Sequence, residues 1–407
     1  MARLSQIFRL VFADLGHEKL LSLCQIVAIA AVLAPLLVLF GLREGVIGTL
    51  IERLNRDPAM RLVVPEVTGA NRFDAAWFKR IGERPDVAFV LPSTRAIAGQ
   101  VDLARADDPA APVVRVSWLP TALGDPLSPV GKPLADGLTT ISLSAAAAER
   151  LGARAGATVN AAIERQRAGK IEPVRIQLKV GEVVPPELYD GVAAFVSLPL
   201  LEAVQAYRDG YAVPALGWEG DGPAPAMEAY PLFRLYARSI RDVPSLAADL
   251  RAEGVVVSTH EGEIASALNL ERNLTTVLLV ITGLALIGFV VAVAINAVAG
   301  VERKRKHLAV LKLVGYGPSW LTGIPLLQAG VLALAGAVVA VAAFAGVAVV
   351  VNAAFAGSLQ GGEAACRLSA AQLCGAGAAT VLIAMIPALF GGLLAARIEP
   401  SLELRDV

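Results

Sequence analysis

Two glycine-lysine pairs are the residues best suited to bind a nucleotide, but their spacing is wrong for a phosphate-binding loop. Such a loop reads G-x-x-x-x-G-K-[ST], because backbone N–H groups and the lysine must surround the same phosphates. Gly131-Lys132 is followed by Pro133, and no glycine stands five residues before Gly131. Gly169-Lys170 is followed by Ile171 and also lacks that glycine. We therefore expect neither an ATPase nor another recognisable enzyme on this chain.

The histidines and cysteines form no set that suits metal binding or nucleophilic catalysis. His260 stands beside glutamates, but a zinc-binding helix needs a second histidine four residues away, and none is near. Cys24, Cys366 and Cys374 leave the whole middle of the chain without cysteine, so disulfides cannot hold that region together. We expect no metal site and no catalytic residue, and we expect Cys366 to be a free thiol in an outer loop.

The densest group of ionisable residues lies in the basic segment, which we define as residues 302–320. It opens with five charged residues. Helical geometry places Leu308, Leu311 and Val314–Gly315 on one face, with Arg303, Lys306 and His307 beside it. Gly315, Gly317 and Pro318 are predicted to end this helix. A basic amphipathic helix lies on a membrane surface or docks in a groove of a partner. The alternative is a loop that only sets membrane topology. The candidate contact residues are Glu302, Arg303, Lys304, Arg305, Lys306, His307, Leu308, Leu311, Leu313 and Gly315.

The basic segment lies between long apolar stretches that predict a membrane protein. The chain has 407 residues and is 56% hydrophobic, whereas soluble domains are about 45–50% apolar. About 20 apolar residues are needed for a helix to cross the hydrocarbon core. Four stretches without Asp, Glu, Lys or Arg are long enough. The predicted spans are residues 20–42, 274–301, 321–352 and 370–396.

Lysine and arginine bias predicts the orientation of these spans. Residues 1–19, the basic segment and the tail 397–407 are expected in the cytoplasm, because the first two carry most of the basic residues near the spans. Residues 43–273 and the loop 353–369 are expected outside. A cleaved signal peptide is the alternative for the first span, but the run is too long and no A-x-A site follows it.

Residues 43–273, between the first span and the other three, are predicted to fold as an α+β extracytoplasmic domain, in one or two subdomains. Short β-like runs alternate with helical ones, and helices at residues 44–54 and 261–273 are expected to form stalks that join the spans. The predicted strands are residues 62–67, 88–91, 113–116, 174–184, 193–197, 232–237 and 255–258. The predicted helices are residues 74–82, 144–151, 198–207 and 243–252, with Asp74 as the cap of the first.

Polar residues inside the spans are sparse. No span contains Asp, Glu, Lys, Arg or His, which argues against a proton-coupled carrier and for an external source of energy. Asn296, Gln328 and Asn352 are predicted to form hydrogen bonds between helices.

The basic segment resembles the coupling helix of ABC-transporter permeases of the MacB, FtsX and LolC type. Their pattern is roughly E-R-x-R-E-[IL]-[AG]-[VIL]-[LM]-[KR]-x-[LIV]-G, and His307 stands where they have an acidic residue. Three further segments are similar to the same family. They are residues 387–405 at the C-terminus, residues 141–159 with Ala157 in place of an aspartate, and residues 8–45 at the start.

The resemblance implies a permease subunit of the bacterial cytoplasmic (inner) membrane. Its partners would be a cytoplasmic ABC ATPase, which binds the ATP and Mg²⁺, and a second permease copy in a homodimer or a heterodimer. A periplasmic adaptor or client and membrane lipid would be further partners; nucleic acid would not. The implied function is ATP-driven motion that exports or extracts a lipid, lipoprotein, peptide or similar amphiphile. The alternatives are a mechanotransmitting regulator of an extracytoplasmic enzyme and an ATPase-independent sensor or scaffold.

Overall fold

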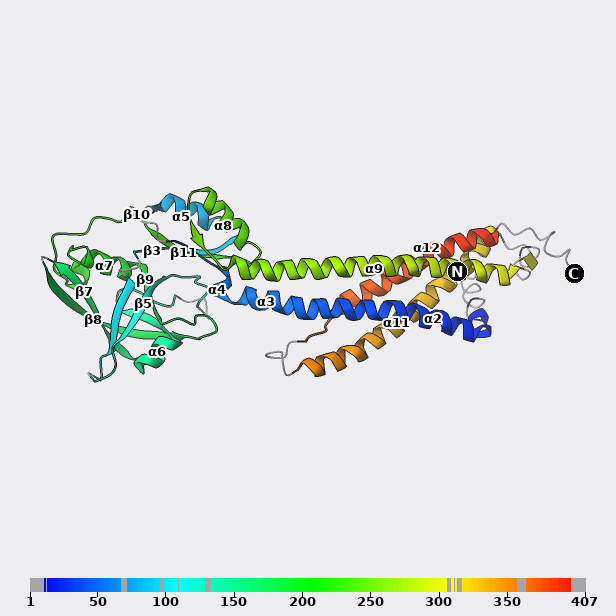
Figure 1. Ribbon diagram of the computed structural model, residues 1–407, viewed down its shortest axis with the longest axis horizontal. Helices are drawn as coiled ribbons and strands as arrows, with labels where there is room; N and C mark the ends of the chain where they lie inside the picture. The colour runs from blue at the N-terminus through cyan, green and yellow to red at the C-terminus, as the bar shows by residue number, and fades with distance from the viewer. Residues whose placement is uncertain are drawn as a thin grey trace. The chain divides into compact units, whose positions relative to one another are not determined.

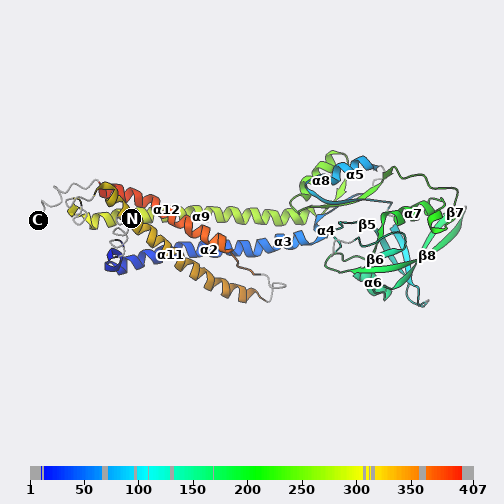
Figure 2. The same ribbon diagram turned by 180° about the vertical axis from the view of Figure 1, so that it is seen from behind.

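A computed structural model describes residues 11, 13–66, 72–95, 99–108, 110–128, 133–167, 169–305, 309–310, 312, 317–356 and 364–396. The chain divides into two compact units (Figures 1 and 2). We call residues 1–51 and 268–407 the helical unit and residues 52–267 the α+β unit. Each unit is described by itself.

Long apolar helices dominate the helical unit. Among the described residues, four helical stretches are long and apolar enough to cross a membrane: Lys19–Arg56, Glu261–Arg303, Thr322–Phe355 and Ala370–Leu393. The elements are α2 (Lys19–Leu42), a π-helix (Arg43–Ile47), α3 (Gly48–Arg56), α9 (Glu261–Arg303), α11 (Pro318–Phe355) and α12 (Ala370–Ala396). A proline lies inside α2, α11 and α12, whereas the 43 residues of α9 contain none. Each predicted span falls within one of these helices, while its crossing of a bilayer stays a prediction.

Gly317 and Pro318 mark the start of α11, since Gly317 is its extended N-cap and Pro318 is its first residue. Proline suits this position because it lacks an N–H group, and the N–H groups of the first turn of a helix have no intrahelical partner in any case. Residues 313–316 lie outside the described residues, so the end of the basic-segment helix at Gly315, Gly317 and Pro318 stays a prediction.

Small residues let the helices of this unit approach closely. α11 packs against both α2 and α12, and Figures 1 and 2 show these three helices together. A Cβ placed on Gly336 of α11 would lie only 2.7 Å from Ile29 of α2. Ile29 shares a buried cluster with Phe289 of α9, Ala333 of α11 and Ala384 of α12. Close contact through small residues is the usual way in which membrane helices associate.

The segment before α12 is fixed against α2 and α11. The Asn352 amide donates to the carbonyl oxygen of Cys366 at 3.0 Å, and its oxygen accepts from the Cys366 N–H at 2.8 Å. A Cβ on Gly45 of the π-helix would collide with the carbonyl oxygen of Ala365. Cys366 is a free thiol as expected, but it is 2% exposed, and burial raises its pKa. Cys366 lies in the loop before α12 as expected, while the placement of this loop outside the membrane stays a prediction.

The larger part of the α+β unit is a closed six-stranded barrel in the order β4-β5-β9-β6-β8-β7. Its strands are β4 (Gln100–Arg105), β5 (Val114–Thr121), β6 (Thr140–Ser144), β7 (Thr158–Arg167), β8 (Lys170–Val184) and β9 (Ala193–Ser197). β5–β9 and β6–β8 pair in parallel, and the other neighbours pair antiparallel. The helices α6 (Ala145–Leu151) and α7 (Leu198–Arg208) add their apolar residues to the core of the barrel. Ser144 and Ser197 cap these helices with their hydroxyl oxygens.

A four-stranded antiparallel sheet in the order β12-β1-β11-β3 forms the other part of this unit. Its strands are β1 (Leu62–Pro65), β3 (Val87–Ser93), β11 (Leu232–Ala237) and β12 (Val257–Ser258), and a separate ribbon pairs β2 (Phe73–Asp74) with β10 (Ala229–Tyr230). The helices α5 (Ala75–Gly82) and α8 (Val243–Ala252) lie side by side in Figures 1 and 2. Arg80, in α5, pairs with Glu253 at 2.7 Å. Asp74 caps α5 as predicted, since its carboxylate accepts from the Trp77 N–H at 2.8 Å.

A buried ion pair joins the sheet to the barrel. Arg234 of β11 and Asp125, in the turn after β5, bond to each other with side chains 6% and 0% exposed. Asp125 also accepts from the Thr121 hydroxyl at 2.8 Å and from the Leu127 N–H at 3.0 Å. The Arg234 guanidinium lies 5.5 Å from the ring centre of Tyr236. The negative charge of the Asp125 carboxylate and the positive charge of the Arg234 guanidinium thus neutralise each other in a site that is shielded from solvent.

Candidate functional site

The basic segment begins where α9 ends. Residues 302–305, 309, 310, 312 and 317–320 lie in the part of the chain that the structure describes. The remaining predicted contact residues lie outside it: Lys306, His307, Leu308, Leu311, Leu313 and Gly315. Which face of the segment these six present therefore stays a prediction.

The described charges at the end of α9 fall into two groups. Glu302, Arg303 and Arg305 are exposed, and Arg305 pairs with Glu302 at 3.1 Å. Lys304 instead turns toward the chain itself, where it meets Asp14 and Glu18. Glu302, Arg303 and Arg305 are thus accessible from solvent, whereas Lys304 pairs with carboxylates far away in the sequence.

Two neighbouring residues further along the basic segment differ sharply in burial. Ala309 is fully buried, whereas Val310 is 49% exposed. Both are helical. One side of this short stretch is therefore covered by the chain itself, and Val310 offers an apolar surface on another side.

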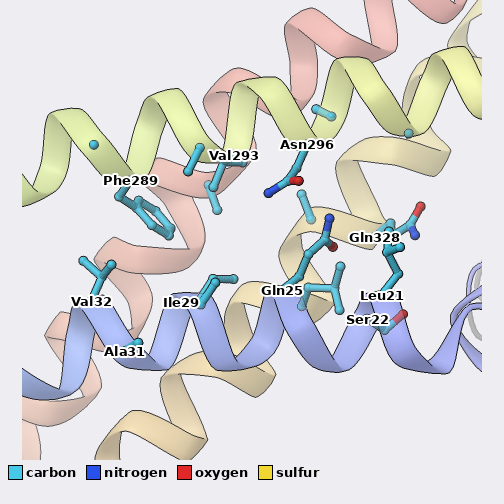
Figure 3. A pocket seen from close by; sticks show the side chains of 18 of the residues that line it. Leu21, Ser22, Gln25, Ile29, Ala31, Val32, Phe289, Val293, Asn296 and Gln328 are labelled. Atoms are coloured by element: carbon cyan, nitrogen blue, oxygen red, sulfur yellow. The ribbon is translucent and has the colours of Figure 1, made fainter.

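A groove of about 520 Å³ lies between α2 and α9, and residues of α11 and α12 complete its wall. Figure 3 shows Leu21, Ile29 and Val32 of α2 on one side, facing Phe289 and Val293 of α9. The end of the groove that adjoins the basic segment is lined by Glu18, Arg303 and Lys304. The groove is thus apolar along most of its length and charged at one end.

Three amide side chains lie in the groove. Gln25 of α2, Asn296 of α9 and Gln328 of α11 line it together (Figure 3). Hydrogen bonds between helices were predicted for Asn296, Gln328 and Asn352. Among the described residues, the first two form none, and Asn352 bonds the backbone of Cys366 instead. Amide groups that face an apolar groove without partners are available to a polar ligand or to water.

Some residues of this site were not foreseen. Gln25 lines the groove, and Asp14 and Glu18 contact Lys304. A signal for Gln25 is present in the sequence, because it is the one amide in the first apolar stretch, residues 20–42. The described residues contain no group of three or more His, Cys, Asp and Glu side chains that could hold a metal ion.

Comparison with known proteins gives one family. Residues 278–400 match the family model described as FtsX-like permease C-terminal. The matched range includes most of the apolar part of α9, the whole basic segment, α11 and α12. No curated protein matches the chain.

Proposed function

Because residues 278–400 match the FtsX-like permease family model, we propose that the chain is an ABC permease of the FtsX, MacB and LolC type. In this proposal it is the membrane subunit that couples a separate ABC ATPase to work on an amphiphile. The observation that carries this proposal is the family match itself, because it spans the basic segment together with the helices on both sides of it. A permease of this type works with an ABC ATPase and in a dimeric assembly. That this chain itself binds such an ATPase and a second permease copy is part of the proposal.

In this proposal the basic segment is the docking site of the ATPase. Arg303 and Arg305 are exposed at the end of α9, where a guanidinium can pair with carboxylates of a partner in two parallel hydrogen bonds. Val310 adds exposed apolar area, and apolar contacts at the centre of an interface supply most of its affinity. ATP and Mg²⁺ would be bound by the partner, since neither glycine-lysine pair of this chain has the spacing of a phosphate-binding loop.

The orientation follows from the distribution of basic residues. We propose that the basic segment and both termini face the cytoplasm of a bacterium and that the α+β unit lies outside. ATP-driven movement of the ATPase pair would then reach the outer face through the helices of the permease dimer.

An amphiphile is the substrate class that the groove supports best. Its walls are apolar along α2 and α9, which suits an acyl chain or an apolar side chain. Gln25, Asn296 and Gln328 belong to the predicted spans and offer donors and acceptors for an amide, ester or hydroxyl group of the same molecule. Export or extraction of a lipid, lipoprotein or peptide uses both properties.

The test is affinity purification of the tagged full chain in mild detergent, with mass spectrometry of the co-purifying chains and an ATPase assay. We expect a stoichiometric partner that contains a phosphate-binding loop. Val310→Asp should remove it, because a buried carboxylate without a partner is costly at an interface. Val256→Asp is the matched control, since Val256 is 46% exposed and lies in the α+β unit.

Several outcomes separate the readings of this chain. Loss of the ATPase from Val310→Asp but not from Val256→Asp supports docking through the basic segment. If no nucleotide-binding chain co-purifies in any detergent, coupling to an ATPase is wrong, and the chain is a sensor or a scaffold. An ATPase together with a stoichiometric extracytoplasmic hydrolase, and no bound amphiphile, would favour a regulator of that hydrolase.

A further inference from the structure

Lys304 lies close to two carboxylates from residues near the N-terminus, Asp14 and Glu18. Its Nζ bonds the Asp14 carboxylate and lies 3.4 Å from a Glu18 oxygen. The three side chains are 22%, 33% and 32% exposed, so the group is half-buried rather than free in solvent. Residues 13–17 are helical, and the Glu18 N–H donates to the Asp14 carbonyl oxygen at 3.1 Å. The four-residue spacing therefore places both carboxylates on one side of this short helical stretch.

Burial distinguishes Lys304 from its charged neighbours. Glu302, Arg303 and Arg305 are exposed and accessible to a partner. The charge of Lys304 is instead compensated by distant residues of the same chain. Lys304 thus ties the end of α9 to residues before the first span, and contact with an ATPase would require it to leave two carboxylates.

The same point is where the regular helix α9 stops. The Lys304 N–H donates to the carbonyl oxygens of both Gly300 and Val301, at 3.3 and 3.2 Å, a shared bond that is common in the last turn of a helix. Just before it, α9 packs tightly, since a Cβ on Gly391 of α12 would lie 3.0 Å from Ala297. The last turns of α9 are thus held by α12 and by the two carboxylates near the N-terminus.

We propose that Asp14 and Glu18 are positioning residues of the basic segment. By holding Lys304 they fix the direction in which the chain leaves α9, and so the orientation in which Arg303, Arg305 and Val310 meet the ATPase. The inference rests on the proposed function, and it adds that the residues before the first span take part in coupling. Without the carboxylates the segment would still bind the ATPase, but movement of the ATPase would be transmitted less completely to α9.

The test combines charge reversal with rescue in the full complex. Lys304→Glu sets three carboxylates against one another, and we expect the ATPase rate that the permease controls to change about fivefold or more, with the amount of co-purified ATPase unchanged. The triple variant Asp14→Lys, Glu18→Lys and Lys304→Glu restores the pairing with reversed signs and should restore the rate. Lys304→Gln should give an intermediate effect. Arg272→Glu is the control, because it makes the same charge change at an exposed position of the same helix.

A second measurement keeps this inference separate from the proposed function. In the permease alone, with Cys24 and Cys374 replaced by alanine, a short bismaleimide should cross-link the Asp14→Cys, Lys304→Cys variant and should not cross-link Asp14→Cys, Arg272→Cys. Absence of the first cross-link overturns the proposal. So does a wild-type rate in Lys304→Glu, or a loss that the triple variant does not repair. The cross-link can also form while the wild-type permease binds no ATPase. In that case Asp14 and Lys304 do lie close together, but coupling to an ATPase is wrong, and so is the positioning role of the carboxylates.

Discussion

Among single residues, we expect buried charged side chains to affect the stability of this chain most. Asp125 and Arg234 are such a pair, and three groups of the barrel and the sheet meet on the Asp125 carboxylate: Thr121, Leu127 and Arg234. Two further nitrogens of Arg234, Nε and Nη1, have no hydrogen-bond partner among the described residues. Removal of the carboxylate alone would leave a buried cation without compensation, which is worse than removal of both charges.

We predict that Asp125→Ala lowers the free energy of unfolding by about 3–5 kcal/mol, the usual cost of breaking a buried ion pair from one side. The double variant Asp125→Ala, Arg234→Met should lose clearly less, because no unpaired charge remains. Urea unfolding of the full chain in detergent, followed by tryptophan fluorescence, measures both. An equal loss in the single and the double variant would show that the hydrogen bonds of Asp125, and not its charge, stabilise this contact.

A tyrosine in the same contact predicts a dependence on alkaline pH. Burial raises the pKa of Tyr236 to about 12, and the positive charge of Arg234 offsets part of that rise. The folded chain therefore keeps this phenol protonated after the unfolded chain, with a pKa near 10, has lost the proton. Stability is fully present below about pH 10 and falls as the pH rises toward 12, by up to about 3 kcal/mol.

The Tyr236→Phe variant should lose this part of the alkaline dependence. Unfolding free energies at pH 9 and about pH 11.5 measure the effect in both proteins, because the first value lies below the window between the two pKa values and the second lies well inside it. Since burial also raises the pKa of Tyr189 and of Tyr207, some dependence on pH should remain. A Tyr236→Phe protein with an undiminished fall would mean that Tyr236 ionises at its ordinary pKa in the folded chain.

At the scale of elements, the π-helix packs closely against the segment before α12. Gly45 lies against the backbone of Ala365, and backbone cannot move aside as a side chain can. Nearby, Arg43 pairs with Glu44 at 2.9 Å and reaches Glu271 and Thr275 of α9 at 3.4 and 3.3 Å. π-Helical turns are rare and occur mostly where they serve packing or function.

We predict that Gly45→Ala separates the π-helix from the segment before α12. The loss of unfolding free energy should reach or exceed the ~1–3 kcal/mol that overpacking costs in a core. Maleimide labelling of Cys366, read by mass spectrometry, should rise from near zero, because the thiol is now 2% exposed. Gly283→Ala is the control, since a Cβ there has no neighbour within 4 Å. Unchanged protection of Cys366 in Gly45→Ala would contradict the prediction.

Elements defined by local pattern were predictable from the sequence, and those defined by distant partners were not. The apolar stretches predicted the long helices, and β8, β9 and β11 were predicted because their β-branched residues alternate or cluster. β4, β6 and β7 were missed. Their pairing closes the barrel between segments far apart in the chain, such as Asp102 with Ala162, and a single sequence does not show such partners. The groove was missed for the same reason, because Gln25, Asn296 and Gln328 come together only when three helices pack.

For the whole molecule, orientation in the membrane is the property to test first. We predict that Val256→Cys is labelled from outside intact cells by a maleimide that cannot cross membranes, and that Val310→Cys is labelled only after permeabilisation. Both positions are close to half exposed, at 46% and 49%, so access to the reagent decides the result. Cys24 and Cys374 are replaced by alanine in both proteins. The opposite pattern would reverse the orientation and place the basic segment outside.

The four long helices also differ in how they respond to force. α2, α11 and α12 each contain a proline, at positions 35, 325 and 387, where a backbone hydrogen bond is missing and bending is easiest. α9 contains no such point over its 43 residues, a length of about 65 Å at 1.5 Å per residue. By this argument α9 resists bending more than the other three helices, so a force applied along its axis would be transmitted over its whole length.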